Sequence, residues 1–324
     1  MALLNFLLES LAFGATFIYG STGEIITEKA GHLNLGIPGI MCMGGAGGCA
    51  ILNVIGKSDL PPMVIVLIAV VFSFVSAALM GLIYSFLTVT LRCNQNVTGL
   101  ALTTIGVGLS WTIMAKLKQT QCLTTPKKYF RYPFYDNVKE WQEMGLSSMQ
   151  KLGIMFFLAI IVAVVASYVL YHTKVGLNLR AVGENPATAD AVGINVTRYK
   201  YLATCIGSGI AGLGGLYYFV DFAASGDAYK SLEAFGWLSI ALVIFALWRP
   251  NITIIGSIVF GILFSCSSMV ANISFIHITM STTPLLRMLP YVVTIIVLII
   301  TSIGNKRGNQ PPAHLGQSYF REDR

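Results

Sequence analysis

Residues 173–200 read TKVGLNLRAVGENPATADAVGINVTRYK and form the most polar interior loop of an otherwise apolar chain. Asn185 is a good helix cap, Pro186 suits the first position of a helix, and Gly193 can end one. The loop therefore predicts a short helix over residues 186–192; the plainest alternative is a solvated connection between two membrane helices. Its charged side chains should keep it at a wet protein surface; they are Arg180, Glu184, Asp190, Arg198 and Lys200.

The composition on either side of this loop is that of an integral membrane protein. Of the 324 residues, 55% are apolar and only 11% are charged, and the mean hydropathy is +0.72. One large soluble core is excluded because the uncharged runs are as long as a bilayer is thick, about twenty residues or more. These runs cover residues 60–91, 93–115, 152–171, 201–220, 250–286 and 288–305.

The apolar segments predict an all-α membrane protein, a polytopic bundle of about nine transmembrane helices, some of them broken or short. A polar hairpin over residues 24–32 should follow the first segment, and the glycine-rich second segment should be either broken or very tightly packed. We expect a membrane domain over residues 1–303, with a hydrophilic insertion at 116–151, and a polar tail at 304–324. The segments are 3–23, 33–55, 62–91, 97–115, 152–171, 201–220, 234–248, 252–271 and 286–303.

Several patterns that could suggest other functions are discounted. Residues 45–50 match the glycine pattern of a dinucleotide site without a preceding strand, and residues 51–58 lack the first glycine of a phosphate-binding loop. The formal charge of +7 is scattered among loops, which argues against nucleic-acid binding. Neither the cysteines nor the histidines suggest a metal site, and each histidine ring is expected at an interface or in solvent. Apart from Glu9, the acidic residues are expected at segment ends. This placement disfavours a membrane enzyme and an ion-coupled secondary transporter.

Four stretches of the sequence resemble one family of permeases. The stretch LRAVGENPATADAVGINV, residues 179–196, is similar to the cytoplasmic coupling loop of permeases that serve ABC importers for nucleosides, simple sugars and branched-chain amino acids. The closest likeness within the family is to the shorter of two paralogous permease subunits of bacterial nucleoside importers. The other stretches are GEIITEKAGHLNLGIPGI (23–40), NQNVTGLAL (94–102) and WLSIALVIFALWRPN (237–251). In the family the LNLG motif usually continues with an acidic residue. Here Pro38 stands in the place of that residue.

The resemblance implies a transport subunit that is not itself an enzyme. A paralogous permease would complete the pathway, a cytoplasmic ABC ATPase would bind ATP and magnesium, and an extracytoplasmic substrate-binding protein would deliver the solute. This chain would bind no cofactor itself. It would lie in the bacterial cytoplasmic membrane with its N-terminus and the 116–151 insertion outside and its tail inside. The ATPase-coupling residues would be Arg180, Gly183, Glu184, Asn185, Pro186, Asp190, Gly193 and Ile194.

The solute is expected to pass beside irregular helices, because free backbone groups in a membrane are tolerated only against protein or water. A nucleoside is the expected solute; ribose, another simple sugar or a branched-chain amino acid remain as alternatives. For each candidate side chain the alternative role is that of a buried amide that satisfies a helix end. The candidates are Asn34, Gly36, Pro38, Gly39, Asn94, Gln95, Asn96 and Thr98.

Overall fold

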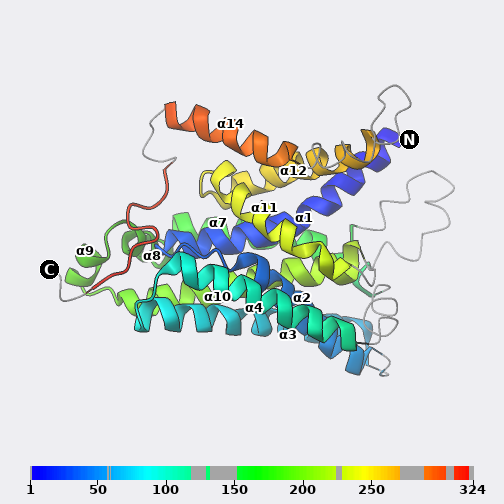
Figure 1. The fold of residues 1–324 in the computed structure, drawn as a ribbon, viewed down its shortest axis with the longest axis horizontal. Helices are drawn as coiled ribbons and strands as arrows, with labels where there is room; N and C mark the ends of the chain where they lie inside the picture. Colours follow the sequence, from blue (N-terminus) through cyan, green and yellow to red (C-terminus); the bar gives the residue numbers. More distant parts are fainter. Residues whose placement is uncertain are drawn as a thin grey trace.

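The computed structural model describes residues 2–56, 58, 60–117, 129–131, 152–223, 228–270, 288–303 and 310–320, and its regular structure there is helical. The helices form one bundle in which the short α8 and α9 project from one end (Figure 1). Most of the 116–151 insertion lies outside the described residues.

Six helices of the described residues are long and apolar enough to cross a membrane. Two of them continue into π-helical turns, and α11, α12 and α14 are further apolar helices. A polytopic all-α membrane protein is thereby confirmed, while the number of crossings stays a prediction. The six are α1 (Ala2–Lys29), α2 (Ile37–Ile55), α3 (Pro62–Ser85) with η1 (Phe86–Thr90), α4 (Gln95–Lys116), α7 (Ile154–His172), and α10 (Val196–Leu216) with η4 (Tyr217–Phe222). The others are α11 (Leu232–Phe245), α12 (Pro250–Val270) and α14 (Leu289–Ile303), with a short η5 (Ala228–Lys230) before α11.

Helix α10 lies at the centre of the bundle and packs against α1, α2 and α3. Glycines allow this approach: a Cβ added to Gly44 would lie 2.5 Å from the carbonyl oxygen of Gly212, and one added to Gly48 would lie 2.5 Å from the Leu216 side chain. Small residues at such positions let helix backbones touch. Helix α2 is continuous through its glycines, so tight packing is confirmed for this segment and a break within it is not.

The predicted hairpin over residues 24–32 is wrong, because α1 continues as a helix to Lys29. Glu24 and Glu28 lie inside it, 0% and 3% exposed. Each carboxylate accepts a hydrogen bond from a distant segment: Glu24 from the Asn34 amide at 3.0 Å, and Glu28 from the Trp248 indole. Since buried carboxylates need such donors, the helix can keep both acids inside the bundle. Both acids lie in the last two turns of α1, as expected of acidic residues at segment ends, but they are buried.

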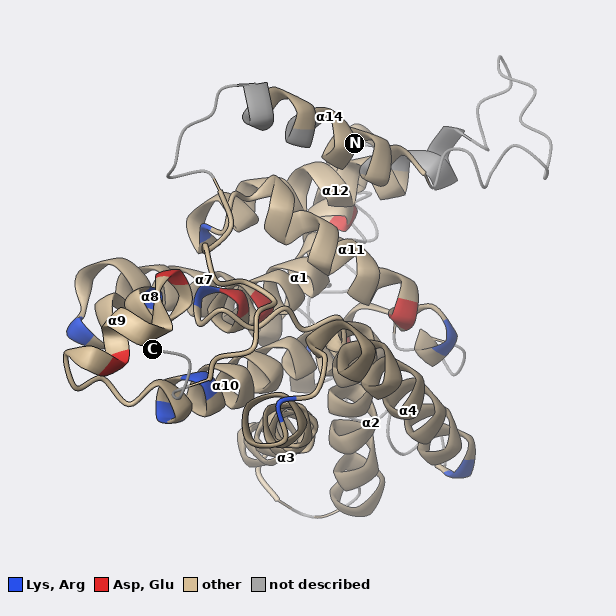
Figure 2. Ribbon diagram, turned by 60° about the vertical axis from the view of Figure 1, so that its left-hand side comes forward, with Lys and Arg blue, Asp and Glu red and all other residues tan. Residues whose placement is uncertain are grey.

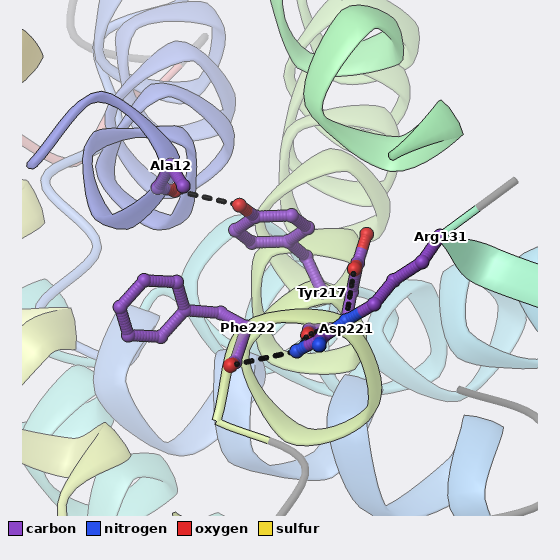
Figure 3. Close-up of polar contacts among 5 residues, drawn as sticks. All are labelled: Ala12, Arg131, Tyr217, Asp221 and Phe222. Carbon is purple, nitrogen blue, oxygen red and sulfur yellow. Dashed lines mark hydrogen bonds and ion pairs between the residues drawn. The ribbon is translucent and has the colours of Figure 1, made fainter. Parts of the chain in front are cut away.

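A third buried acid, Asp221, lies at the carboxyl end of η4, where a loop was expected (Figure 3). The Arg131 guanidinium lies 3.6 Å from its carboxylate and donates through Nε to its backbone carbonyl at 3.1 Å. In the same turn the Tyr217 hydroxyl donates to the Ala12 carbonyl at 2.6 Å. These contacts hold the end of η4 against α1 and against residues 129–131.

Charged residues gather mainly around α8, α9 and the neighbouring end of α10, while the middle of the bundle has few of them (Figure 2). This distribution is the one expected of helices that cross an apolar layer.

The glycine contact between α2 and α10 predicts a strong asymmetry between two identical substitutions. Gly44→Ala should destabilise the folded protein by about 1–3 kcal/mol, because the new Cβ has no room against the Gly212 backbone. Gly108→Ala on α4 is the matched control, since an added Cβ there meets nothing within 4 Å. Thermal unfolding of both variants in detergent measures the difference. Equal melting temperatures would contradict this account of the packing.

Candidate functional site

The predicted short helix is confirmed as α9 (Pro186–Ala191). The Asn185 Oδ1 caps it by accepting a hydrogen bond from the Thr188 amide at 3.0 Å, and Pro186 occupies the first turn. Gly193 follows the helix with a φ of +86°, a conformation that suits glycine. The local residues therefore specify this helix, as the sequence indicated.

A second helix, α8 (Lys174–Glu184), precedes α9 and was not predicted. The Thr173 hydroxyl oxygen accepts a hydrogen bond from the Gly176 amide at 3.2 Å and caps it. Its buried positions are Gly176, Leu179, Val182 and Gly183, which follow the three- and four-residue spacing of one helix face. That spacing and the Thr173 cap were available in the sequence and could have indicated this helix.

Helix α8 is seated on the end of α1, and α9 packs against α8 and the start of α10. A Cβ added to Gly183 would lie 3.0 Å from the Lys29 carbonyl carbon and 3.2 Å from the Gly31 amide, so only glycine fits there. The Arg180 guanidinium lies 5.1 Å from the centre of the Tyr171 ring, a cation–π contact with the end of α7. Pro186 and Ala189 are buried, whereas Val192 is 71% exposed. The two short helices therefore present one face outward and are fixed to the bundle by the other.

The C-terminal segment, residues 310–320, lies across these short helices (Figure 1). The His314 amide donates to the Gly183 carbonyl at 3.0 Å, and the Ala313 amide donates to the Glu184 carboxylate at 3.2 Å. The Tyr319 hydroxyl lies 3.0 Å from Asp190 Oδ2 and donates to it. Two predicted coupling residues, Glu184 and Asp190, thus accept hydrogen bonds from the chain's own tail.

The non-helical segment between α1 and α2 lies beside the contact of α8 with the end of α1. Side chains supply hydrogen bonds to the backbone of this segment. The Leu33 amide donates to the Gln95 side chain at 2.8 Å, and the Leu33 carbonyl accepts from the Tyr84 hydroxyl at 2.7 Å. The Leu35 carbonyl accepts from the Thr103 hydroxyl at 2.8 Å. A non-helical segment at this depth is tolerated because protein groups replace the missing backbone hydrogen bonds.

Asn34 is the one predicted pathway residue in this segment with a buried amide nitrogen to spare. Its Oδ1 accepts from the Gly36 amide at 2.9 Å, and its Nδ2 has no hydrogen-bond partner within the described residues. Pro38 and Gly39 pack instead, against Gly236 and against the α4 backbone respectively. Of these four residues, only Asn34 has a donor that a polar solute could use.

The remaining pathway candidates gather at the beginning of α4. Asn94 caps that helix, with its Oδ1 accepting from the Val97 amide at 3.1 Å, and Asn96 is exposed, whereas Thr98 is buried. Gln95 donates to the Gln317 carbonyl at 3.2 Å. This arrangement places the start of α4 at the same end of the bundle as α8 and α9. A role in solute passage stays a prediction for all of these residues.

His32 and Lys200 are buried at this end, against expectation. His32 is 1% exposed, and its Nδ1 lies 2.9 Å from the Thr204 hydroxyl of α10, so the expected interfacial or solvated ring is wrong. Burial and the nearby charge of Lys200 hold the pKa of the His32 imidazole well below its ordinary value. Lys200 lies inside α10, which begins five residues earlier than predicted, and is 3% exposed rather than wet.

Comparison with known proteins assigns most of the chain to one kind of membrane protein. Residues 6–298 match the family model described as branched-chain amino acid transport system / permease component. A nucleoside ABC transporter permease of Lactococcus lactis is 31% identical over 293 residues, 90% of each chain. A guanosine ABC transporter permease of Bacillus subtilis is 27% identical over 89% of each chain. A protein of Haloferax volcanii named as a glucose ABC transporter permease is 31% identical over 79% of this chain and 75% of its own.

The tail contacts predict that one hydroxyl helps to hold residues 310–320 in place. Tyr319→Phe removes the hydrogen bond to Asp190, which should cost about 1 kcal/mol and speed amide exchange in the tail about fivefold. Hydrogen exchange at Ala313, His314 and Gly316 measures this. The control is Tyr229→Phe, because the Tyr229 ring contacts Trp111 and its hydroxyl lies away from the tail. Unchanged exchange at all three amides would mean that other contacts hold the tail.

Proposed function

Because this chain belongs to the branched-chain amino acid transport system / permease component family, we propose that it is the membrane permease subunit of an ABC importer for nucleosides. The observation that carries the proposal is the nucleoside permease relative, which aligns with 90% of each chain. The exposed, capped helix α9 supports it as the element on which an ATPase could act.

In this proposal residues 173–200 form the coupling loop and α9 is the coupling helix. Separate ATPase subunits bind ATP with magnesium and grip α9, a paralogous permease completes the pathway, and an extracytoplasmic binding protein delivers the solute. The membrane domain covers residues 1–303, and the tail, residues 304–324, is cytoplasmic. The N-terminus and the 116–151 insertion lie outside a bacterial cytoplasmic membrane.

The contacts of the coupling loop suggest how movement would spread. Gly183 sits against the backbone at the end of α1, and α10 begins within the loop, at Val196. A displacement of α9 by the ATPase would therefore act on α1 and α10 together, because neither the contact with α1 nor the connection to α10 contains a long flexible segment. Since α1 packs on α10, α11 and α12, and α10 packs on α2 and α3, the bundle would rock between two arrangements as ATP binds and leaves.

A simple sugar is the second candidate solute, because one relative is named as a glucose permease. Both solutes carry hydroxyl groups that a neutral amide can bind without a charge. We propose Asn34 as the pathway residue to examine first, since its Nδ2 has no hydrogen-bond partner in the described part of the chain. A pathway lined by neutral donors would favour both solute classes over a charged amino acid.

Uptake measurements distinguish the solutes. In cells that lack this chain, uptake of labelled inosine should fall to background, while uptake of labelled ribose and glucose should be unchanged. Restoring the chain should restore inosine uptake. Loss of sugar uptake alone would overturn the nucleoside assignment and leave the permease assignment in place.

The coupling loop predicts an uncoupled variant. Changing Pro186→Gly together with Glu184→Ala should leave the bundle folded and lower transport at least tenfold. The rate of ATP hydrolysis should no longer depend on substrate. The matched control, Pro62→Gly with Glu9→Ala, also removes a first-turn proline and an acid, on α3 and α1. ATP hydrolysis and solute uptake are measured for both double variants in the reconstituted importer. Normal substrate-stimulated hydrolysis with normal transport would contradict the role of α9.

A further inference from the structure

A cavity of about 830 Å³ opens between the coupling loop and the membrane helices. Its walls come from four parts of the chain that are far apart in sequence. They are His32, the end of η1 with the turn after it, residues 190–202, and Tyr319 of the C-terminal segment. The cavity lies at the end of the bundle where charged side chains gather (Figure 2).

Basic side chains dominate the polar lining of this cavity. Arg92, Arg198 and Lys200 line it, and the one acidic residue in the lining, Asp190, already accepts a hydrogen bond from Tyr319. Lys200 is buried, yet no residue in the described part of the chain accepts a hydrogen bond from its ammonium or forms an ion pair with it. Because its ammonium is not fully enclosed, it can reach the open cavity, where an anionic ligand would pair with it.

The beginning of α10 adds further donors. The Asn195 side chain caps the helix by accepting from the Arg198 amide at 2.9 Å, while the first-turn amides of Val196 and Thr197 precede the intrahelical hydrogen bonds. Both residues line the cavity, and the positive end of the helix dipole faces the same space. Guanidinium, ammonium and backbone amides together form a site for the oxygens of a phosphate group.

The charge of Lys200 acts on two neighbouring histidines. The His32 ring lines the cavity, and His314 lies on the C-terminal segment. Burial first, and then the charge of Lys200, lowers the pKa of both imidazoles. The groups facing Lys200 are thus basic or neutral, and an incoming anion would meet no carboxylate apart from Asp190.

The cavity is also open toward the apolar flank of α10. Val89, Ile194 and Leu202 line it, and Leu202 is 49% exposed. One turn further along the same face of α10, Ile206 is 45% exposed. An apolar strip therefore runs from the basic cavity along a membrane helix, which is the shape required by a headgroup attached to acyl chains.

From this combination we infer that the cavity binds the phosphate headgroup of an anionic phospholipid, with Lys200 and Arg198 on the phosphate and acyl chains along Leu202 and Ile206. A free phosphate shares the headgroup chemistry but would make no use of the apolar strip. The lipid would connect η1, α10 and the coupling loop, so it would become part of the surface that moves with α9.

The test is lipid binding by the purified full-length chain, measured by native mass spectrometry with phosphatidylglycerol, phosphatidylcholine and glycerol 3-phosphate offered separately. Phosphatidylglycerol should bind at least tenfold more tightly than the other two. Lys200→Gln should remove this preference, whereas Lys174→Gln, an exposed lysine on α8, should leave it unchanged. If Lys200→Gln does not fold, Arg198→Gln tests the same site, because Arg198 is exposed. This substitution should weaken phosphatidylglycerol binding at least threefold.

Three results would overturn the inference. Equal binding of phosphatidylcholine would mean an apolar groove without headgroup recognition, and equal binding of glycerol 3-phosphate would mean a site for a free anion. Binding that appears only after residues 321–324 are deleted would mean that the full-length chain does not take up the lipid. Since no step of the assay depends on transport, its result is independent of the solute and of the proposed function.

Discussion

The backbone contact between α10 and its neighbours is the constraint on which the rest of the structure depends. Where Gly44 meets Gly212 and Gly23 meets Gly207, the helices touch without intervening side chains. Within a membrane no water is available to drive helices together, so close packing and satisfied polar groups must hold the bundle. The same approach brings the His32 ring to Thr204 and buries the end of α1 against α10. The seat of the coupling loop therefore follows from glycine spacing in helices far from it.

Buried polar groups give this bundle its specific arrangement. Glu24 and Glu28 lie one turn apart on α1, and their hydrogen-bond donors come from the α1–α2 connection and from Trp248, beyond α11. Arg131 and Asp221 play a similar part at the other end of α10. Each such group would be costly in an apolar layer if it lost its donor, so helices that slid or rotated would be penalised. Packing alone would allow more than one alignment of apolar helices, and these hydrogen bonds favour one.

Features fixed by neighbouring residues could be predicted from the sequence, and features fixed by distant partners could not. The Asn185 cap, Pro186 and Gly193 determine α9 locally, and the apolar runs determine where the long helices lie. Glu24 and Glu28 looked like a solvated hairpin because nothing near them in sequence reveals the Trp248 indole, 220 positions away. Lys200 looked wet for the same reason, since its burial arises from helix packing and from residues 310–320. The pathway candidates were chosen as neutral polar side chains and as residues that break a helix. Two of them, Asn34 and Asn94, accept hydrogen bonds from backbone amides near the start of a helix.

The tail has a consequence for biosynthesis. Residues 310–320 hydrogen-bond to Gly31, Gly183, Glu184 and Asp190, so the coupling loop reaches its described form only after these residues have been made. A ribosome that stalls before these residues leaves a chain whose membrane helices are complete but whose loop lacks its cover. An ATPase that recognises loop and tail together would bypass such products. Subunit assembly would then select full-length chains without a separate inspection step.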